Sequence, residues 1–141
     1  MIAIVRLRGG VNAKKGVEDT LDMLNLKTVN NCTVVPDNAH YRGMIHKVKD
    51  YITYGTVEKE TFKKMLVKWG RTGRKRLALK DADKVVDEIF TGKKLKDFGI
   101  KPVFRLHPPK RGYEGVKIAY AEGGALGDRK EKINALLERM I

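Results

Sequence analysis

The chain has 141 residues, 42% of them hydrophobic, which is enough for one domain with a real core and excludes wholesale disorder. Its 30 lysines and arginines outnumber 17 acidic residues, and the net charge of +13 favours a polyanionic partner, nucleic acid before an anionic membrane surface. No apolar run is long enough to span a bilayer, and the first residues lack the charged start of a secretory signal, so we expect a cytoplasmic protein.

The first half of the chain is predicted to alternate strands and helices. Clustered β-branched residues closed by a glycine pair predict a strand over 1–10, and Asn12 is expected to cap a helix that ends at Leu24. A second strand, a second helix and a third strand are expected at 33–35, 38–49 and 51–57. Gly43 interrupts the second helix, and we expect the close approach of another segment to require it.

The first strand is expected to bury one of its two faces. Alternation directs Ala3, Val5 and Leu7 to a core face. The opposite face begins apolar and ends in two guanidinium groups, those of Arg6 and Arg8. This strand is therefore predicted to end at a basic surface.

The second half is predicted to be a basic extension, 59–141, packed on a core made of 1–58. It should contain a helix over 59–69, a basic loop over 70–76 and a helix opening at Lys80 or Asp81. A turn at 95–99, paired strands at 103–106 and 116–121 forming a basic-tipped hairpin, and a tight turn over 122–127 are expected next. Asp128 and Glu131 predict a capping box for the last helix.

One loop raises the possibility of a small nucleotide-dependent enzyme. The stretch from Gly9 to Gly16 is rich in glycine and lysine and lies between a strand and a helix, but a P-loop needs Ser or Thr directly after Gly-Lys, and none follows here. Lys14 and Lys15 at a helix start suit an RNA phosphate better. The lone Cys32 and the spacing of the histidines predict no disulfide framework, metal site or catalytic group, so we expect no cofactor and no enzyme activity.

The basic clusters carry most of the functional information. One surrounds the glycine-containing loop at 70–76, and another follows the strand at 103–106. Arginine binds phosphate bidentately, and aromatic side chains stack on unpaired bases, so we expect recognition of folded RNA through phosphates and shape. The candidate RNA-binding residues are Arg6, Arg8, Lys14, Lys15, Arg42, Lys47, Lys68, Arg71, Arg74, Lys75, Arg76, Arg105, Lys110, Arg111 and Tyr113.

Several ordered motifs resemble one known family. They are the run from Ile4 to Gly9, the leucines Leu21, Leu24 and Leu26, the stretches 43–55 and 104–109, and the stretch 122–140. Together they resemble the large-subunit ribosomal protein L-thirty family in its longer archaeal and eukaryotic form, called L-seven in eukaryotes. The chain lacks the basic N-terminal extension of eukaryotic relatives, which favours the archaeal form.

The resemblance implies a ferredoxin-like α+β core with helices on one face of the sheet. It also implies a structural protein of the large ribosomal subunit, bound as a monomer to large-subunit rRNA near 5S rRNA and beside other ribosomal proteins. No cofactor accompanies this family. A free RNA-binding regulator remains the alternative, because it would share the same basic loops.

Overall fold

The computed structural model describes residues 1–76 and 82–141, and for Arg76 it describes only the backbone. In these residues, five α-helices flank a mixed six-stranded sheet with the strand order β6-β2-β1-β3-β8-β7, and β4 and β5 form a separate pair. The predicted α+β class is confirmed. The expected opening of a helix at Lys80 or Asp81 lies outside the described residues.

The first half has the predicted alternation of strand and helix. Its elements are β1 (Ile2–Arg6), α1 (Lys15–Met23), β2 (Asn31–Val35), α2 (Ala39–Val48) and β3 (Ile52–Thr56). β1 is antiparallel to both β2 and β3, and Ala3 lies opposite Val34 on one side and Gly55 on the other. The opening strand is therefore central to the sheet.

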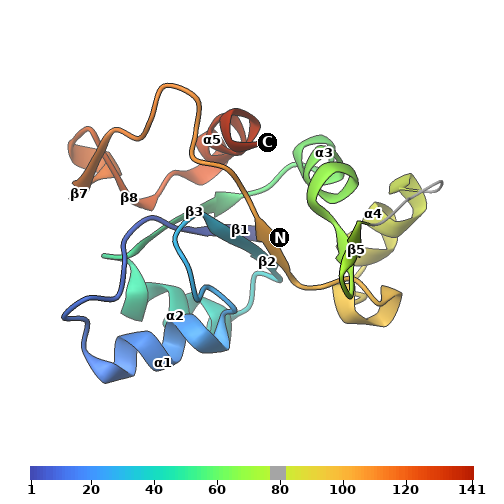
Figure 1. Ribbon diagram of the computed structural model, residues 1–141, viewed down its shortest axis with the longest axis horizontal. Helices are drawn as coiled ribbons and strands as arrows, with labels where there is room; N and C mark the ends of the chain where they lie inside the picture. The colour runs from blue at the N-terminus through green and yellow to red at the C-terminus, as the bar shows by residue number, and fades with distance from the viewer. Residues whose placement is uncertain (77–81) are drawn as a thin grey trace.

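Both faces of β1 are buried, where one buried face was expected. α1 and α2 cover one face, and Ile4 packs there with Leu21 and Ile45. The other face carries Val5 and is covered by Phe62 and other side chains from the second half of the chain. In Figure 1 the sheet runs between α1 and α2 on one side and α3 and α5 on the other. A second helical layer thus completes the core.

The second half of the chain supplies that layer and three more strands of the large sheet. Its α-helices are α3 (Lys59–Trp69), α4 (Ala82–Phe90) and α5 (Ile133–Met140). Its strands are β4 (Arg71–Thr72), β5 (Lys75–Arg76), β6 (Val103–Arg105), β7 (Gly115–Ala119) and β8 (Gly124–Asp128). Its short 3-10 helices are η1 (Leu95–Phe98), η2 (Tyr120–Glu122) and η3 (Lys130–Lys132).

The prediction that 103–106 and 116–121 pair as a hairpin is wrong. β6 pairs with β2 and β7 pairs with β8, so the two strands lie at opposite edges of the sheet. The hairpin of this half is β4–β5, inside the stretch predicted to be a loop. The turn expected over 122–127 is wrong for 124–127, which lie in β8, and β8 pairs with β3 in parallel. Ala125 and Leu126 are buried there.

Three local predictions at single residues also fail. Asn12 has a left-handed backbone and precedes α1, whose N-cap position is Lys14. Gly43 is exposed, and a Cβ there would meet no other segment within 4 Å, so no close approach requires this glycine. Asp128 accepts the Lys130 N–H at 2.8 Å, at the start of η3, and forms no capping box for α5, whose N-cap position is Lys132.

Candidate nucleic-acid interface

The segment 101–110 lies beside the end of α3 and the start of β4. The Lys101 N–H donates to the Arg71 carbonyl at 2.9 Å, and the rings of Trp69 and His107 meet edge to face with centroids 4.7 Å apart. The two segments that carry these basic residues therefore adjoin, and Lys68 and Lys110 also contact the end of α5 through Ile141 and Arg139. We call the set the extension surface; its members are Lys68, Arg71, Arg74, Lys75, Lys101 and Lys110.

The β4–β5 hairpin concentrates the positive charge of this surface. Arg71 lies opposite Arg76, and Thr72 lies opposite Lys75. Gly73 has a φ of +60°, a conformation that glycine adopts without strain, and this allows the tight turn. Arg74 and Lys75 are exposed, and the stretch 70–76 contains no carboxylate to offset them. Mutual repulsion among these cations makes a polyanion a favourable neighbour.

A second group of predicted residues lies on the other side of the sheet. Lys14 and Lys15 are exposed at the start of α1, and a Cβ on Gly16 would lie 3.4 Å from the Lys47 ammonium nitrogen of α2. Arg8 lies over the Tyr51 ring, with its guanidinium carbon 5.4 Å from the ring centroid. We call Arg8, Lys14, Lys15 and Lys47 the helix-layer surface. The structure does not bring it together with the extension surface.

Arg6 is held inside the fold rather than presented to a partner. Its side chain is buried, with the residue only 6% exposed. The guanidinium donates to the carbonyls of Leu26 at 2.7 Å, Lys27 at 2.8 Å and Arg8 at 2.8 Å. These bonds fix the loop before β2 against the end of β1. Arg6 therefore stabilises the fold, and we leave it out of the interface proposed below.

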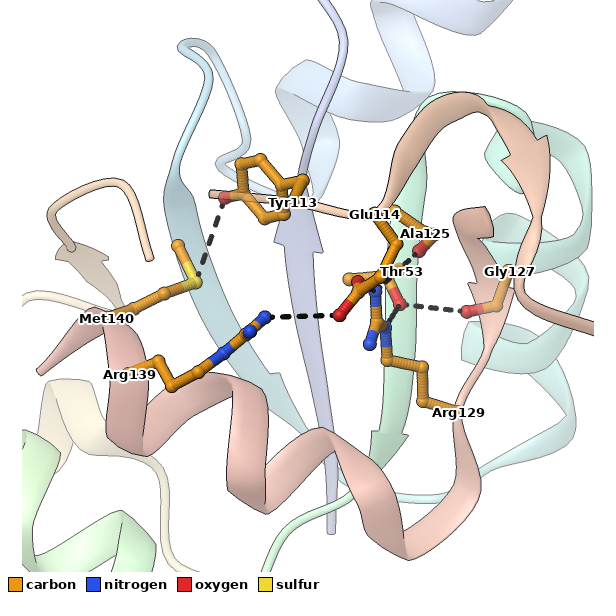
Figure 2. Close-up of polar contacts among 8 residues, drawn as sticks. All are labelled: Thr53, Tyr113, Glu114, Ala125, Gly127, Arg129, Arg139 and Met140. Carbon is orange, nitrogen blue, oxygen red and sulfur yellow. Dashed lines mark hydrogen bonds and ion pairs between the residues drawn. The ribbon is translucent and has the colours of Figure 1, made fainter. Parts of the chain in front are cut away.

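Tyr113 is held by contacts within the chain as well. Its hydroxyl donates to Asn30 Oδ1 at 2.6 Å and lies 3.7 Å from the Met140 sulfur (Figure 2 shows the second contact). Burial raises the pKa of this phenol. The ring joins the loop after β6 to the loop before β2 and to α5, so it is not placed to stack on a base. We leave Tyr113 out as well.

The other predicted residues lie apart from the two surfaces. Arg42 forms a bidentate ion pair with Asp37 at 2.5 and 2.7 Å, and this contact lowers the pKa of the Asp37 carboxyl. Its charge is therefore balanced locally. Arg105 is exposed on the edge strand β6, on the opposite side of that strand from buried Phe104. Arg111 is exposed in a turn.

The glycine-rich loop before α1 does not have the features of a nucleotide site. A Cβ on Gly10 would lie 2.8 Å from the Glu18 carboxylate and 3.1 Å from the Arg6 guanidinium, so a carboxylate that would repel a phosphate already lies beside the nearest arginine of the loop. Within residues 1–76 and 82–141, no cluster of three or more His, Cys, Asp and Glu side chains could hold a metal ion. None of the helices in the same ranges is long and apolar enough to cross a membrane.

Sequence reasoning missed a buried arginine in the last third of the chain. Arg129 is only 5% exposed; it donates to Glu114 Oε2 at 2.7 Å and to Thr53 Oγ1 at 3.1 Å (Figure 2). Arg139 approaches the second oxygen of Glu114 at 3.3 Å. The pKa of Glu114 is lowered, first because Arg129 donates to its carboxylate. Nothing in the sequence around Arg129, which follows Asp128 in a chain rich in basic residues, indicates that its side chain is buried.

The family follows from comparison with known proteins. The family model described as Ribosomal protein L30p/L7e matches residues 2–52, which cover β1 to the start of β3. The large ribosomal subunit protein uL30 of Methanococcus vannielii is 50% identical over 151 aligned positions, which cover 99% of this chain and 98% of that relative. The chain belongs to the ribosomal protein L30p/L7e family.

Other L30p/L7e relatives match over the whole length as well. The uL30 proteins of Methanosphaera stadtmanae and Methanothrix thermoacetophila are each 46% identical, covering 100% and 99% of both chains in each pair. The sequence similarity to these relatives therefore extends over the second half of the chain, although the family model matches only residues in the first half. The family is one of ribosomal proteins and not of enzymes, which agrees with the prediction from the sequence.

Proposed function

We propose that this protein is a structural constituent of the large ribosomal subunit that binds large-subunit rRNA through the extension surface. The observation that carries the proposal is that the basic β4–β5 hairpin and the basic segment 101–110 meet at the end of α3. The relatives are named as large ribosomal subunit proteins, which points to rRNA as the polyanion. The helix-layer surface would provide a second, separate contact.

The expected mode of binding is phosphate and shape recognition. The guanidinium groups of Arg71 and Arg74 can each hold a phosphate bidentately. The flat faces of β1, β2 and β3 are buried under helices, so these strands cannot offer aromatic side chains as a platform for bases. The protein would act as a monomer within the subunit, in the cytoplasm, close to neighbouring ribosomal proteins. A position near 5S rRNA, which the family resemblance implies, belongs to the same proposal.

The test compares two triple variants in binding to large-subunit rRNA across a range of salt. Changing Arg71, Arg74 and Lys75 to Ala removes three cations from the extension surface. Each lost phosphate contact should reduce the slope of log affinity against log salt by roughly 0.7–0.9, so the slope should fall by about 2–3. An unchanged affinity and slope would reject the extension surface as an rRNA contact.

A matched control changes the same number of charges on α3. Lys59, Lys63 and Lys64 pair with Asp87, Asp83 and Glu138 at 2.5–2.6 Å, so their charges are already balanced. Their change to Ala alters the net charge equally and should leave the slope near that of the unmodified protein. Sedimentation of the native protein separates the ribosomal role from that of a free RNA-binding regulator: recovery wholly outside the large-subunit fraction at low salt would contradict the proposal.

A further inference from the structure

A cavity of about 710 Å³ lies between α5, η2 and the start of β8, outside both basic surfaces. Its size falls in the range of small-molecule sites, roughly 300–1,000 Å³. The side chains that line it include an aromatic ring, a carboxylate and three cations: Tyr120, Glu114, Arg129, Lys132 and Arg139. The rRNA-binding mode described above uses none of them.

The aromatic ring of the cavity is held by an arginine that lines the same cavity. The guanidinium carbon of Arg129 lies 4.6 Å from the centroid of the Tyr120 ring, and Arg129 itself is buried. The cation therefore covers one face of the ring, and both side chains border the cavity. Beside it, Gly123 has a φ of +86°, and a Cβ there would meet nothing within 4 Å, so the wall next to the ring is open. This leaves space for a planar ligand beside Gly123, against the face of the ring that Arg129 does not cover.

The carboxylate is oriented by the same arginine. Glu114 receives Arg129 Nη2 at 2.7 Å on one oxygen and Arg139 Nη2 at 3.3 Å on the other (Figure 2), and its side chain is 40% exposed. An ionised carboxylate only accepts hydrogen bonds and offers about four lone-pair positions, so two remain for a ligand. With its charge offset by two guanidinium groups, Glu114 would tolerate a nearby phosphate yet still select a ligand with two adjacent donors.

These features fit one class of ligand. We propose that the cavity, which we call the Tyr120 pocket, holds an unstacked guanine nucleotide of RNA. The base stacks on Tyr120, its N1–H and N2–H donate to the Glu114 carboxylate, and the exposed Lys132 faces its phosphate. Adenine presents an acceptor at N1, which would oppose the carboxylate, so it should be rejected. This inference rests on the proposed rRNA binding and adds a base-specific contact to it.

The experiment titrates the isotope-labelled full chain with guanosine monophosphate and follows the backbone amides by NMR. We expect saturable shifts at Gly123, Gly124 and Ala121. Adenosine monophosphate should bind about 5-fold or more weakly, because both edge donors, N1–H and N2–H, are lost. Inosine monophosphate, which keeps N1–H and lacks the N2 amino group, should fall between the two. No saturable shift at about 10 mM guanosine monophosphate, or equal affinity for the two purines, would overturn the pocket.

Variants separate the pocket from the fold and from the basic surfaces. Glu114→Gln should reduce the affinity for guanosine monophosphate to that for adenosine monophosphate. Tyr120→Leu should reduce the affinity for both nucleotides. Glu131→Gln, which removes an exposed carboxylate that does not line the cavity, is the matched control and should bind as the unmodified protein does. Thermal unfolding checks that each variant is folded. If Glu114→Gln does not fold because the Glu114 ion pairs are lost, Tyr120→Leu still tests the pocket.

The two proposals fail in different ways. Tyr120→Leu removes no charge, so it should lower rRNA affinity without changing the salt slope, unlike the triple variant of the extension surface. Salt-dependent rRNA binding with no nucleotide binding would overturn the Tyr120 pocket and leave the proposed function standing. Nucleotide binding with no rRNA binding would overturn the proposed function and, with it, the assignment of the pocket to RNA.

Discussion

Replacing Gly55 with alanine tests how tightly the second half of the chain is docked on the first. Gly55 lies in β3, and a Cβ there would be 2.0 Å from the Lys130 carbonyl oxygen and 3.0 Å from two carbons of Ile133. The oxygen belongs to the backbone of η3 and cannot rotate away. β3 and the η3–α5 segment would have to separate, straining the hydrogen bond from the Arg129 N–H to the Tyr54 carbonyl, now 2.8 Å.

The expected effect is a clear loss of stability. Overpacking of this kind costs about 1–3 kcal/mol, and the reduced freedom of the unfolded chain offsets up to ~1 kcal/mol of that. Because the contact at 2.0 Å is with a backbone atom, we expect a cost near the upper end, about 3 kcal/mol, and a net loss of about 2–3 kcal/mol. For a chain of this length each kcal/mol shifts the Tm by about 3 °C, so Gly55→Ala should lower the Tm by ~6–9 °C. Thermal unfolding followed by circular dichroism, with urea unfolding as a second measure, provides the assay.

Gly43→Ala is the matched control, because it makes the same chemical change with the opposite expected sign. Gly43 is an exposed position of α2 where an added Cβ meets no other segment. Alanine should stabilise this helix by up to about 1 kcal/mol. A Gly55→Ala protein as stable as the unmodified one would refute the tight contact between β3 and η3.

Three further predictions concern residues whose roles depend on long-range contacts. Tyr113→Phe removes the hydrogen bond to Asn30 and should lower the free energy of unfolding in urea by ~0.5–1.5 kcal/mol. The rRNA affinity should stay unchanged. A loss of affinity in the folded variant would show that Tyr113 contacts the rRNA. Because the pKa of Glu114 is lowered on folding, its contribution to stability is present above its ordinary value of 4.5 and is lost as pH falls through the lower folded value. Tm measured against pH should therefore decline less steeply below about pH 4.5 in Glu114→Gln than in the unmodified protein, and parallel curves would contradict this. The fragment 1–58 by itself should show no cooperative unfolding transition, because one face of its sheet would lose its cover, and a sharp transition would show that this part folds independently.

Local patterns in the sequence predicted the elements that local physics determines. The helix over 59–69 has the predicted boundaries, because Phe62, Met65, Leu66 and Trp69 repeat at helical spacing and all are buried. β8 was missed because Gly124 and Gly127 weaken any strand pattern. A Cβ on Gly124 would lie 2.0 Å from the Ile118 carbonyl oxygen, so the glycine reflects a tertiary contact that no local pattern reveals.

The candidate interface was predictable in its composition but not in its geometry. The basic residues of 70–76 were identified from charge alone, and the exposed side chains of Arg74 and Lys75 agree with that interpretation. Arg6 could not be distinguished from them, because two of its three carbonyl partners, Leu26 and Lys27, lie about twenty residues away in the sequence. Spacing likewise gave no sign that Arg129 would be buried against Glu114. Long-range contacts decide whether an arginine supports the fold or faces a partner.

Mapping protein–RNA crosslinks in intact large subunits tests the central claim most directly. We expect this chain to be recovered with the large subunit and its crosslinks to concentrate on the extension surface, above all on Arg71, Arg74 and Lys75. Arg6 and Tyr113 should give none. Recovery of the chain with the subunit but without any crosslink on the extension surface would contradict the proposed mode of rRNA binding.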